Sequence, residues 1–84
     1  MDDVHLVRRA QDGDERAARQ LFDLYHLRTY RLALGLLGDE SDAEEVAQDA
    51  LTYALLNITR YKADLSRFST WLHTITVSRA RDKR

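Results

Sequence analysis

The stretch that decides the fold is LFDLYHLRTYRLALGLLGDESDAEEVAQDALTYAL, residues 21–55, in which an apolar-rich run gives way to a block of acids and then returns. Before the acids, apolar side chains recur at steps of three and four residues, which is the spacing of one helix face. The pattern predicts a helix that begins after Asp14, a capping residue, and ends near Leu37 at Gly38, which favours a left-handed stop. Gly35 inside this helix suggests a closely packed neighbour, with a tolerated weakness as the alternative.

The acidic block begins a further helix. Ser41 and Glu44 have the spacing of a capping box, so we expect this helix to start near residue 41 and to run to about Arg60. Its apolar side consists mostly of alanine and valine. One polar stripe lies on a different face, because its members fall at i, i+3, i+4 and i+7. The stripe consists of Glu45, Gln48, Asp49 and Thr52.

Two interpretations of this stripe remain open. Most charged helix faces are simply solvated. However, Leu51, Leu55 and Leu56 extend the apolar surface around the helix, and an apolar patch with a polar rim is typical of a docking surface.

The flanking segments complete an all-α, compact four-helix domain with one short N-terminal helix and three longer ones. Asp2 or Asp3 can cap a short helix over residues 3–11, which ends at Gly13. The helical period lapses over residues 61–67, which we predict to be a loop, and a last helix starts at Phe68. The sequence has no proline and three glycines, so sheets and long loops are disfavoured. A single domain over residues 1–84 is expected.

Composition excludes several classes of function. There is no cysteine, so disulfides and thiolate metal sites are ruled out, and a reducing compartment such as the cytoplasm is allowed. We find neither a membrane span nor a signal peptide. The three histidines are far apart, and the sequence has no phosphate loop or nucleophile elbow. We therefore predict no metal, no cofactor and no enzyme activity.

Charge is distributed unevenly along the chain. Residues 1–50 hold 6 basic and 12 acidic side chains, whereas residues 51–84 hold 7 basic and 2 acidic ones. We therefore expect acidic and basic surfaces at opposite ends of the bundle. The acidic one would bind a protein, and the basic one would bind phosphate.

The basic half mixes cations with aromatic rings, the combination that single-stranded nucleic acid requires. The residues concerned are Arg60, Lys62, Arg67, Arg79, Arg81, Lys83 and Arg84, with Tyr61, Phe68, Trp71 and His73. The alternative is that the rings are structural, because Phe68, Trp71, Leu72 and Ile75 share one helix face. The opposite arc, Thr70, His73, Thr74, Val77 and Arg81, is then exposed.

Three segments together resemble region 2 of the bacterial RNA polymerase sigma factors, of the extracytoplasmic-function (ECF) type of the sigma-70 family. They are LVRRAQDGDERAARQLFDLYH (6–26), YRLALGLLGDESDAEEVAQDAL (30–51) and RFSTWLHTI (67–75), in the family's order and spacing. The resemblance implies that residues 42–55 dock on the clamp helices of the polymerase beta-prime subunit. The contacts it implies are Asp42, Glu45, Gln48, Asp49, Thr52 and Leu55.

The resemblance also implies that residues 61–81 bind the non-template single strand of the promoter minus-ten element, with the 61–67 loop holding a flipped base. The DNA-binding residues it implies are Tyr61, Lys62, Arg67, Phe68, Thr70, Trp71, Thr74, Ser78 and Arg81. The chain departs from the family at Lys62, Ala63 and Ser66, which replace Asp, Pro and Gly, and at Ser78, which replaces a common Asn. These departures leave the identity of the flipped base open, because a hydroxyl cannot make an amide's bidentate contact with adenine.

Two further expectations concern the chain as a whole. The family's second, helix-turn-helix domain is absent, so the sequence suggests an excised domain, with a natural single-domain relative as the alternative. A function of another class also stays open: a helical interaction module that binds a regulator such as an anti-sigma factor without contacting DNA. A duplex-binding helix-turn-helix protein is disfavoured, because no tight turn leads into a basic recognition helix.

Overall fold

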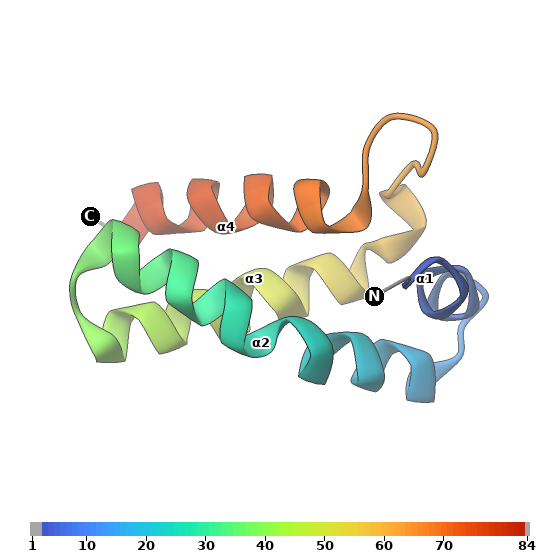
Figure 1. Cartoon of the computed structure of the whole chain (residues 1–84), viewed down its shortest axis with the longest axis horizontal. Helices are drawn as coiled ribbons and strands as arrows, with labels where there is room; N and C mark the ends of the chain where they lie inside the picture. Colours follow the sequence, from blue (N-terminus) through green and yellow to red (C-terminus); the bar gives the residue numbers. More distant parts are fainter. Residues whose placement is uncertain (1–2, 84) are drawn as a thin grey trace.

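The computed structural model describes residues 3–83 and shows an all-helical domain (Figure 1). Its elements are α1 (Val4–Gln11), α2 (Glu15–Leu37), α3 (Glu40–Leu56), the short 3-10 helix η1 (Ile58–Arg60) and α4 (Phe68–Lys83). No strand occurs among the described residues. The predicted fold, one short and three longer helices, is confirmed. None of the helices within residues 3–83 combines the length and apolar character needed to cross a membrane.

The three long helices pack against one another, and α1 packs against the start of α2 and against η1. Figure 1 shows that α2 and α4 run in the same direction, whereas α3 runs opposite to both. The loop before α4 lies at the end of the bundle where α1 sits. The C-terminus lies at the other end, next to the turn between α2 and α3. This topology gives α4 two long edges, one along α3 and one along α2.

Large side chains are concentrated at the loop end of the core. There Leu21, Leu51, Phe68 and Leu72 pack with the ring of Tyr61. The other end is built mainly from small residues, among them Ala33, Ala43, Val46 and Ala80. Small residues let helix backbones approach closely but bury little apolar area each. Burial of large apolar side chains is therefore concentrated at the loop end of the bundle.

The ends of α2 match their predicted signals. The Asp14 Oδ1 atom accepts hydrogen bonds from the amides of Arg16 and Ala17, at 2.9 and 3.3 Å. Hydrogen bonding from the Arg9 side chain and from these amides lowers the pKa of Asp14. At the other end, Gly38 adopts a left-handed conformation with φ of 72°.

Helix α3 starts at Glu40, close to the predicted start near residue 41, but its predicted cap and its predicted end were wrong. Asp39, not Ser41, is the capping residue, and its Oδ1 atom accepts a hydrogen bond of 2.8 Å from the amide of Asp42. Asp39 precedes the first helical residue, the position from which a side chain reaches a free amide of the first turn. The helix ends at Leu56 rather than near Arg60, because the chain tightens into η1.

Two smaller expectations concern Gly35 and the cap of α1. A Cβ atom added to Gly35 would have no neighbour within 4 Å, so this glycine marks no close helix approach and is a tolerated weakness. Asp3 precedes α1 but makes no capping hydrogen bond with its side chain, and Asp2, the other predicted cap, lies outside the described residues. The Asp3 carboxylate instead accepts a hydrogen bond from the Tyr25 hydroxyl, which ties the start of α1 to α2.

Candidate nucleic-acid interface and the two edges of α4

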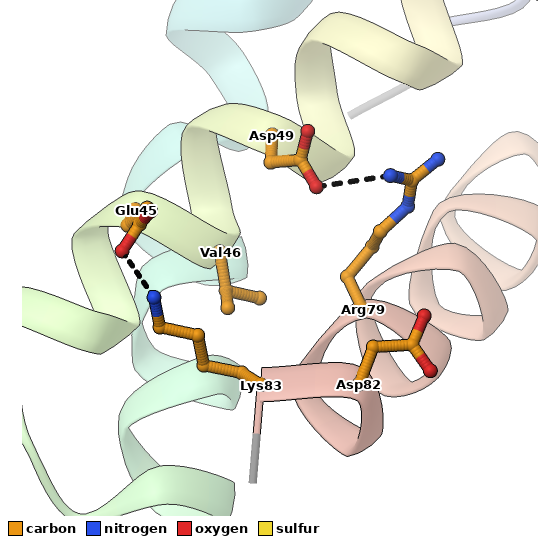
Figure 2. A pocket seen from close by; sticks show the side chains of 6 residues that line it. All are labelled: Glu45, Val46, Asp49, Arg79, Asp82 and Lys83. Carbon is orange, nitrogen blue, oxygen red and sulfur yellow. Dashed lines mark hydrogen bonds and ion pairs between the residues drawn. The ribbon is translucent and has the colours of Figure 1, made fainter.

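The polar stripe on α3 is exposed at all four predicted positions, Glu45, Gln48, Asp49 and Thr52. Its carboxylates, however, pair with α4 (Figure 2). The Lys83 Nζ atom lies 2.5 Å from Glu45 Oε2 and 3.9 Å from Asp42 Oδ1. The Arg79 Nη1 atom lies 3.1 Å from Asp49 Oδ2.

We call the face formed by Glu45, Val46, Asp49, Arg79, Asp82 and Lys83 the α3–α4 seam. Here the expectation of separate acidic and basic surfaces was wrong, because the antiparallel packing of α3 and α4 brings the two halves of the sequence together. The hydrogen bond from Glu45 raises the pKa of Lys83. The Arg79 guanidinium also lies 4.6 Å from the centre of the Tyr53 ring. Because these pairs are exposed, a charged partner can displace them at little cost.

Gln48 and its neighbour Glu44 connect α3 to α2. The Gln48 side chain donates a hydrogen bond of 2.9 Å to Glu44 Oε1, and the His26 Nε2 atom lies 2.7 Å from the same oxygen. The hydrogen bond from Gln48, followed by that from His26, lowers the pKa of Glu44. His26 in turn stacks on the Phe22 ring, with centroids 5.5 Å apart. This contact could not be predicted from local sequence patterns, because His26 and Glu44 are 18 residues apart.

The apolar border of the stripe is narrower than predicted. Leu51 is fully buried and belongs to the core, because residues of both α1 and α4 cover the end of α3. Leu55 is half-buried and packs against the core, whereas Leu56 is 79% exposed. A docking partner would therefore meet Leu55 and Leu56, but not Leu51.

The 61–67 loop is held at its base and exposed at its tip. The Tyr61 hydroxyl donates a hydrogen bond of 2.7 Å to the Ser66 carbonyl. The Gln11 side chain donates to the carbonyls of Ile58 and Tyr61, at 3.1 and 3.0 Å. Residues 62–65 are exposed, including Leu65 at 77%. The loop can therefore meet a partner without losing its anchors.

The aromatic rings beside the loop are mainly structural, as the alternative interpretation held. Phe68 is 2% exposed and Tyr61 is 7% exposed. Phe68 meets the ring of Tyr61 edge-on at 5.6 Å and the ring of Tyr25 at 5.4 Å. Trp71 is half-buried. In the free domain, Tyr61 and Phe68 thus present no open face for base stacking.

A hollow lies between this loop, the start of α1 and the middle of α2. Its volume is about 830 Å³, and its lining includes two cations, Arg28 and Arg67, two carboxylates, Asp3 and Asp64, and the rings of Tyr25 and Phe68. We call it the loop hollow. Burial, followed by the hydrogen bond to Asp3, raises the pKa of Tyr25, so this hydroxyl stays a neutral donor. Arg28 was not predicted as a site residue, because along the sequence it is one polar residue on a long helix.

The outer face of α4 is exposed as predicted. Thr70, His73, Thr74, Ser78 and Arg81 are exposed, while Val77 is half-buried. The Thr74 hydroxyl donates a hydrogen bond of 3.1 Å to the Thr70 carbonyl, which leaves it free to accept a bond from a ligand. Within residues 3–83, no group of three or more histidine, aspartate and glutamate side chains is placed to hold a metal ion.

Comparison with known proteins identifies the class. The sequence model described as Sigma-70 region 2 matches residues 21–84, and the chain belongs to this family. The family consists of transcription initiation factors rather than enzymes, which confirms both the resemblance and the prediction of no enzyme activity.

Two curated relatives place the chain more narrowly. It is 35% identical over 83 residues to the ECF RNA polymerase sigma factor SigW of Bacillus subtilis (strain 168), an alignment that covers 93% of this chain and 43% of SigW. It is 37% identical over 84 residues to the RNA polymerase sigma-H factor of Pseudomonas aeruginosa, covering 95% of this chain and 41% of that protein. The chain thus spans less than half the length of each relative.

A solved structure matches the fold closely. It is the NMR structure of an engineered region 2 of sigmaE in complex with GTAAAA. The TM-score is 0.89 at 29% sequence identity, and the match covers 99% of this chain and 85% of the other.

Proposed function

We propose that this domain acts in transcription initiation by binding core RNA polymerase through α3 and by capturing the single non-template strand of the promoter minus-ten element through the 61–67 loop and α4. The observation that carries the proposal is the close match in fold to a region 2 domain in complex with GTAAAA. Such a role places the domain in the bacterial cytoplasm.

The DNA part of the proposal is supported by the charges around the loop. Lys62, Arg67 and Arg81 are exposed, and among residues 3–83 none of them has a carboxylate within ion-pair distance. Unpaired cations attract phosphates and release counterions when they bind. The loop hollow can accept an unstacked base, and contacts there offset the few kcal/mol that unstacking costs. The domain would act by binding energy alone, without covalent chemistry.

The choice of base depends on contacts that the family pattern does not supply here. Ser78 is exposed on α4 and offers one hydroxyl. Lys62 and Ala63 at the loop tip are exposed as well. We propose that the loop backbone and these side chains set a base preference that differs from the preference of relatives with Asn at the Ser78 position.

The polymerase part is supported by the exposed acids of α3. The beta-prime clamp helices are proposed to contact Asp42, Glu45, Gln48, Asp49, Thr52 and Leu55. Cations of the clamp helices would replace Lys83 and Arg79 as partners of these carboxylates. The exchange is inexpensive, because the intramolecular pairs are exposed and weak. Leu55 and Leu56 supply adjoining apolar area.

The test of the polymerase part is a paired substitution on α3. Replacing Gln48→Ala together with Asp49→Lys should abolish binding to core polymerase in a pull-down assay and leave the circular dichroism spectrum unchanged. A matched control, Gln20→Ala with Asp23→Lys, changes the same residue types on the exposed face of α2. Unchanged polymerase binding by the α3 variant would count against docking through this stripe.

The DNA part is tested with the polymerase-bound domain and a promoter that carries a photoreactive base in the minus-ten segment. Crosslinks should map to residues 61–67 and to the first turns of α4. Crosslinks confined to polymerase subunits would contradict the proposal.

A second candidate is a helical module that binds a regulator, such as an anti-sigma factor, without contacting DNA. The burial of Tyr61 and Phe68 favours it, since both rings already have packing partners. The two candidates differ in salt dependence. Single-strand affinity that falls steeply with salt supports DNA capture, whereas weak affinity at every salt concentration supports the regulator-binding module.

A further inference from the structure

The edge of α4 that faces α2 carries three hollows, of which the first two adjoin. The loop hollow shares Tyr25, Arg28 and Ser69 with a second, smaller hollow. That second hollow reaches Leu32 of α2 and His73 of α4. One helical turn further, a third hollow is lined by Leu36, Val77, Ala80 and Arg81. We call this line of hollows the α2–α4 seam.

The seam has a regular spacing on both sides. Arg28, Leu32 and Leu36 follow one another at steps of four residues on α2, and His73, Val77 and Arg81 do the same on α4. The two helices run in the same direction, so the two rows advance together (Figure 1). Eight residues of helix rise about 12 Å, at 1.5 Å per residue. At the spacing of about 3.4 Å per nucleotide that a strand has when its bases are stacked as in duplex DNA, this length matches about three to four nucleotides.

Charge distinguishes this seam from the α3–α4 seam. Within residues 3–83, no carboxylate lies within ion-pair distance of Arg28 or Arg81. On the other edge, Arg79 and Lys83 are both paired with acids of α3 (Figure 2). The free cations of α4 and its neighbour therefore line the α2 edge of this helix.

Arg28 is placed to bind a phosphate at the entrance to the seam. It is exposed, and its guanidinium lies 5.7 Å from the centre of the Tyr25 ring, which limits its movement. It borders both the loop hollow and the second hollow. A strand whose flipped base occupies the loop hollow would thus pass this cation as it leaves. Beyond it, the partly exposed side chains of Leu32, Leu36 and Val77 offer apolar contact to sugars and base faces.

We propose that single-stranded DNA held at the 61–67 loop continues along the α2–α4 seam, and that Arg28 is a phosphate-binding residue of this track. The inference rests on the proposed function and extends the DNA contacts from the loop and α4 to α2. It assigns the strand to one edge of α4 and excludes the paired α3 edge.

The experiment measures binding of the 84-residue domain to a fluorescein-labelled 12-nucleotide DNA single strand that contains GTAAAA, by fluorescence anisotropy at several salt concentrations. Losing one phosphate contact should reduce the slope of log affinity against log salt by about 0.7 and weaken binding about five-fold at 0.1 M salt. We expect this result for Arg28→Ala. Arg28→Lys retains the charge and should restore most of the slope.

The matched control is Arg31→Ala, which removes an exposed arginine from the same helix but from none of these hollows. It should leave the slope unchanged, as should Arg79→Ala on the paired edge. If wild type binds but Arg28→Ala keeps the wild-type affinity and slope, the inference is overturned and the proposed function stands. If wild type does not bind the single strand even at 50 mM salt, both the inference and the DNA part of the proposed function are overturned.

Discussion

Basic side chains line both edges of α4, but they are paired with carboxylates along α3 and have no such partner along α2 among the described residues. Along α3, Arg79 and Lys83 pair with Asp49 and Glu45. Along α2, neither Arg28 nor Arg81 has a described carboxylate within ion-pair distance, although Asp3 and Asp64 line the same hollow as Arg28. The number of cations on a helix therefore does not show where a phosphate will bind. The acids on the neighbouring helix decide which cations remain available.

The difference arises from helix direction and register. In the antiparallel pair, a step of four residues along α3 from Glu45 to Asp49 matches a step of four back along α4 from Lys83 to Arg79. Both ion pairs therefore form in a single register. On the other edge, α2 places Leu32 in the same hollow as His73 and Leu36 in the same hollow as Arg81. A leucine side chain neutralises no charge.

The largest expected effect on stability comes from weakening the packing of α4 against the core. Leu72 is 3% exposed and packs in the main core, so Leu72→Ala should cost about 2–5 kcal/mol of unfolding free energy. That is a large share of the total expected for a domain of this size. Urea denaturation measures the loss. The control Leu56→Ala, at a residue 79% exposed, should change stability by less than about 0.5 kcal/mol. Equal losses in the two variants would contradict the described core.

A smaller effect on stability is expected at alkaline pH, from Tyr25 at the loop end of the α2–α4 seam. Burial raises the pKa of Tyr25 in the folded state above its usual value of 10.0. Below pH 10 the hydroxyl is protonated in both states, so its contribution to stability is fully present. As the pH rises above 10, the unfolded state loses this proton first, and the free energy of unfolding falls by up to about 1.4 kcal/mol per pH unit for this group.

The measurement is urea denaturation of wild type and Tyr25→Phe at several pH values between 9 and 11. The variant should show a shallower decline, although Tyr61, whose pKa burial also raises, keeps part of it. Identical slopes in the two proteins would show that Tyr25 ionises equally easily in both states.

The smallest effect tests the paired edge directly. A double-mutant cycle with Asp49→Ala and Arg79→Ala should give a coupling of about 0.2–1 kcal/mol, because the pair is exposed. The coupling should shrink in 1 M salt, where screening acts over about 3 Å. Thermal denaturation of the wild type, the two single variants and the double variant gives the coupling energy. A coupling that salt leaves unchanged would indicate that the pair acts through packing, for instance through the contact between Arg79 and the Tyr53 ring.

Much of the fold was readable from local sequence. The apolar spacing before Leu37, the cap at Asp14 and the glycine at position 38 defined α2 within about a residue, because these signals act over one or two turns. The start of α3 was predicted within one residue, but its cap was misassigned, because Asp39 and Ser41 are both good caps and local chemistry alone does not choose between them. Its end was misplaced because the tightening into η1 depends on packing against α1, which is far away in the sequence.

The candidate site was predicted in part. The exposure of the α3 stripe and of the outer arc of α4 followed from helical periodicity. The pairing of that stripe with Arg79 and Lys83, the burial of Tyr61 and the role of Arg28 did not, because each depends on contacts between separate helices. Family resemblance assigned roles to positions, but it could not show which charges are already neutralised.

The sequence by itself determined four helices, their faces and the family, since these depend on periodicity and on motifs within short segments. Only the tertiary structure decided which cations are free, because ion pairing depends on the direction and register of neighbouring helices. Acidic and basic halves that are separate along the chain meet along α3 and α4, and the unpaired positive charge is left beside α2 and the loop.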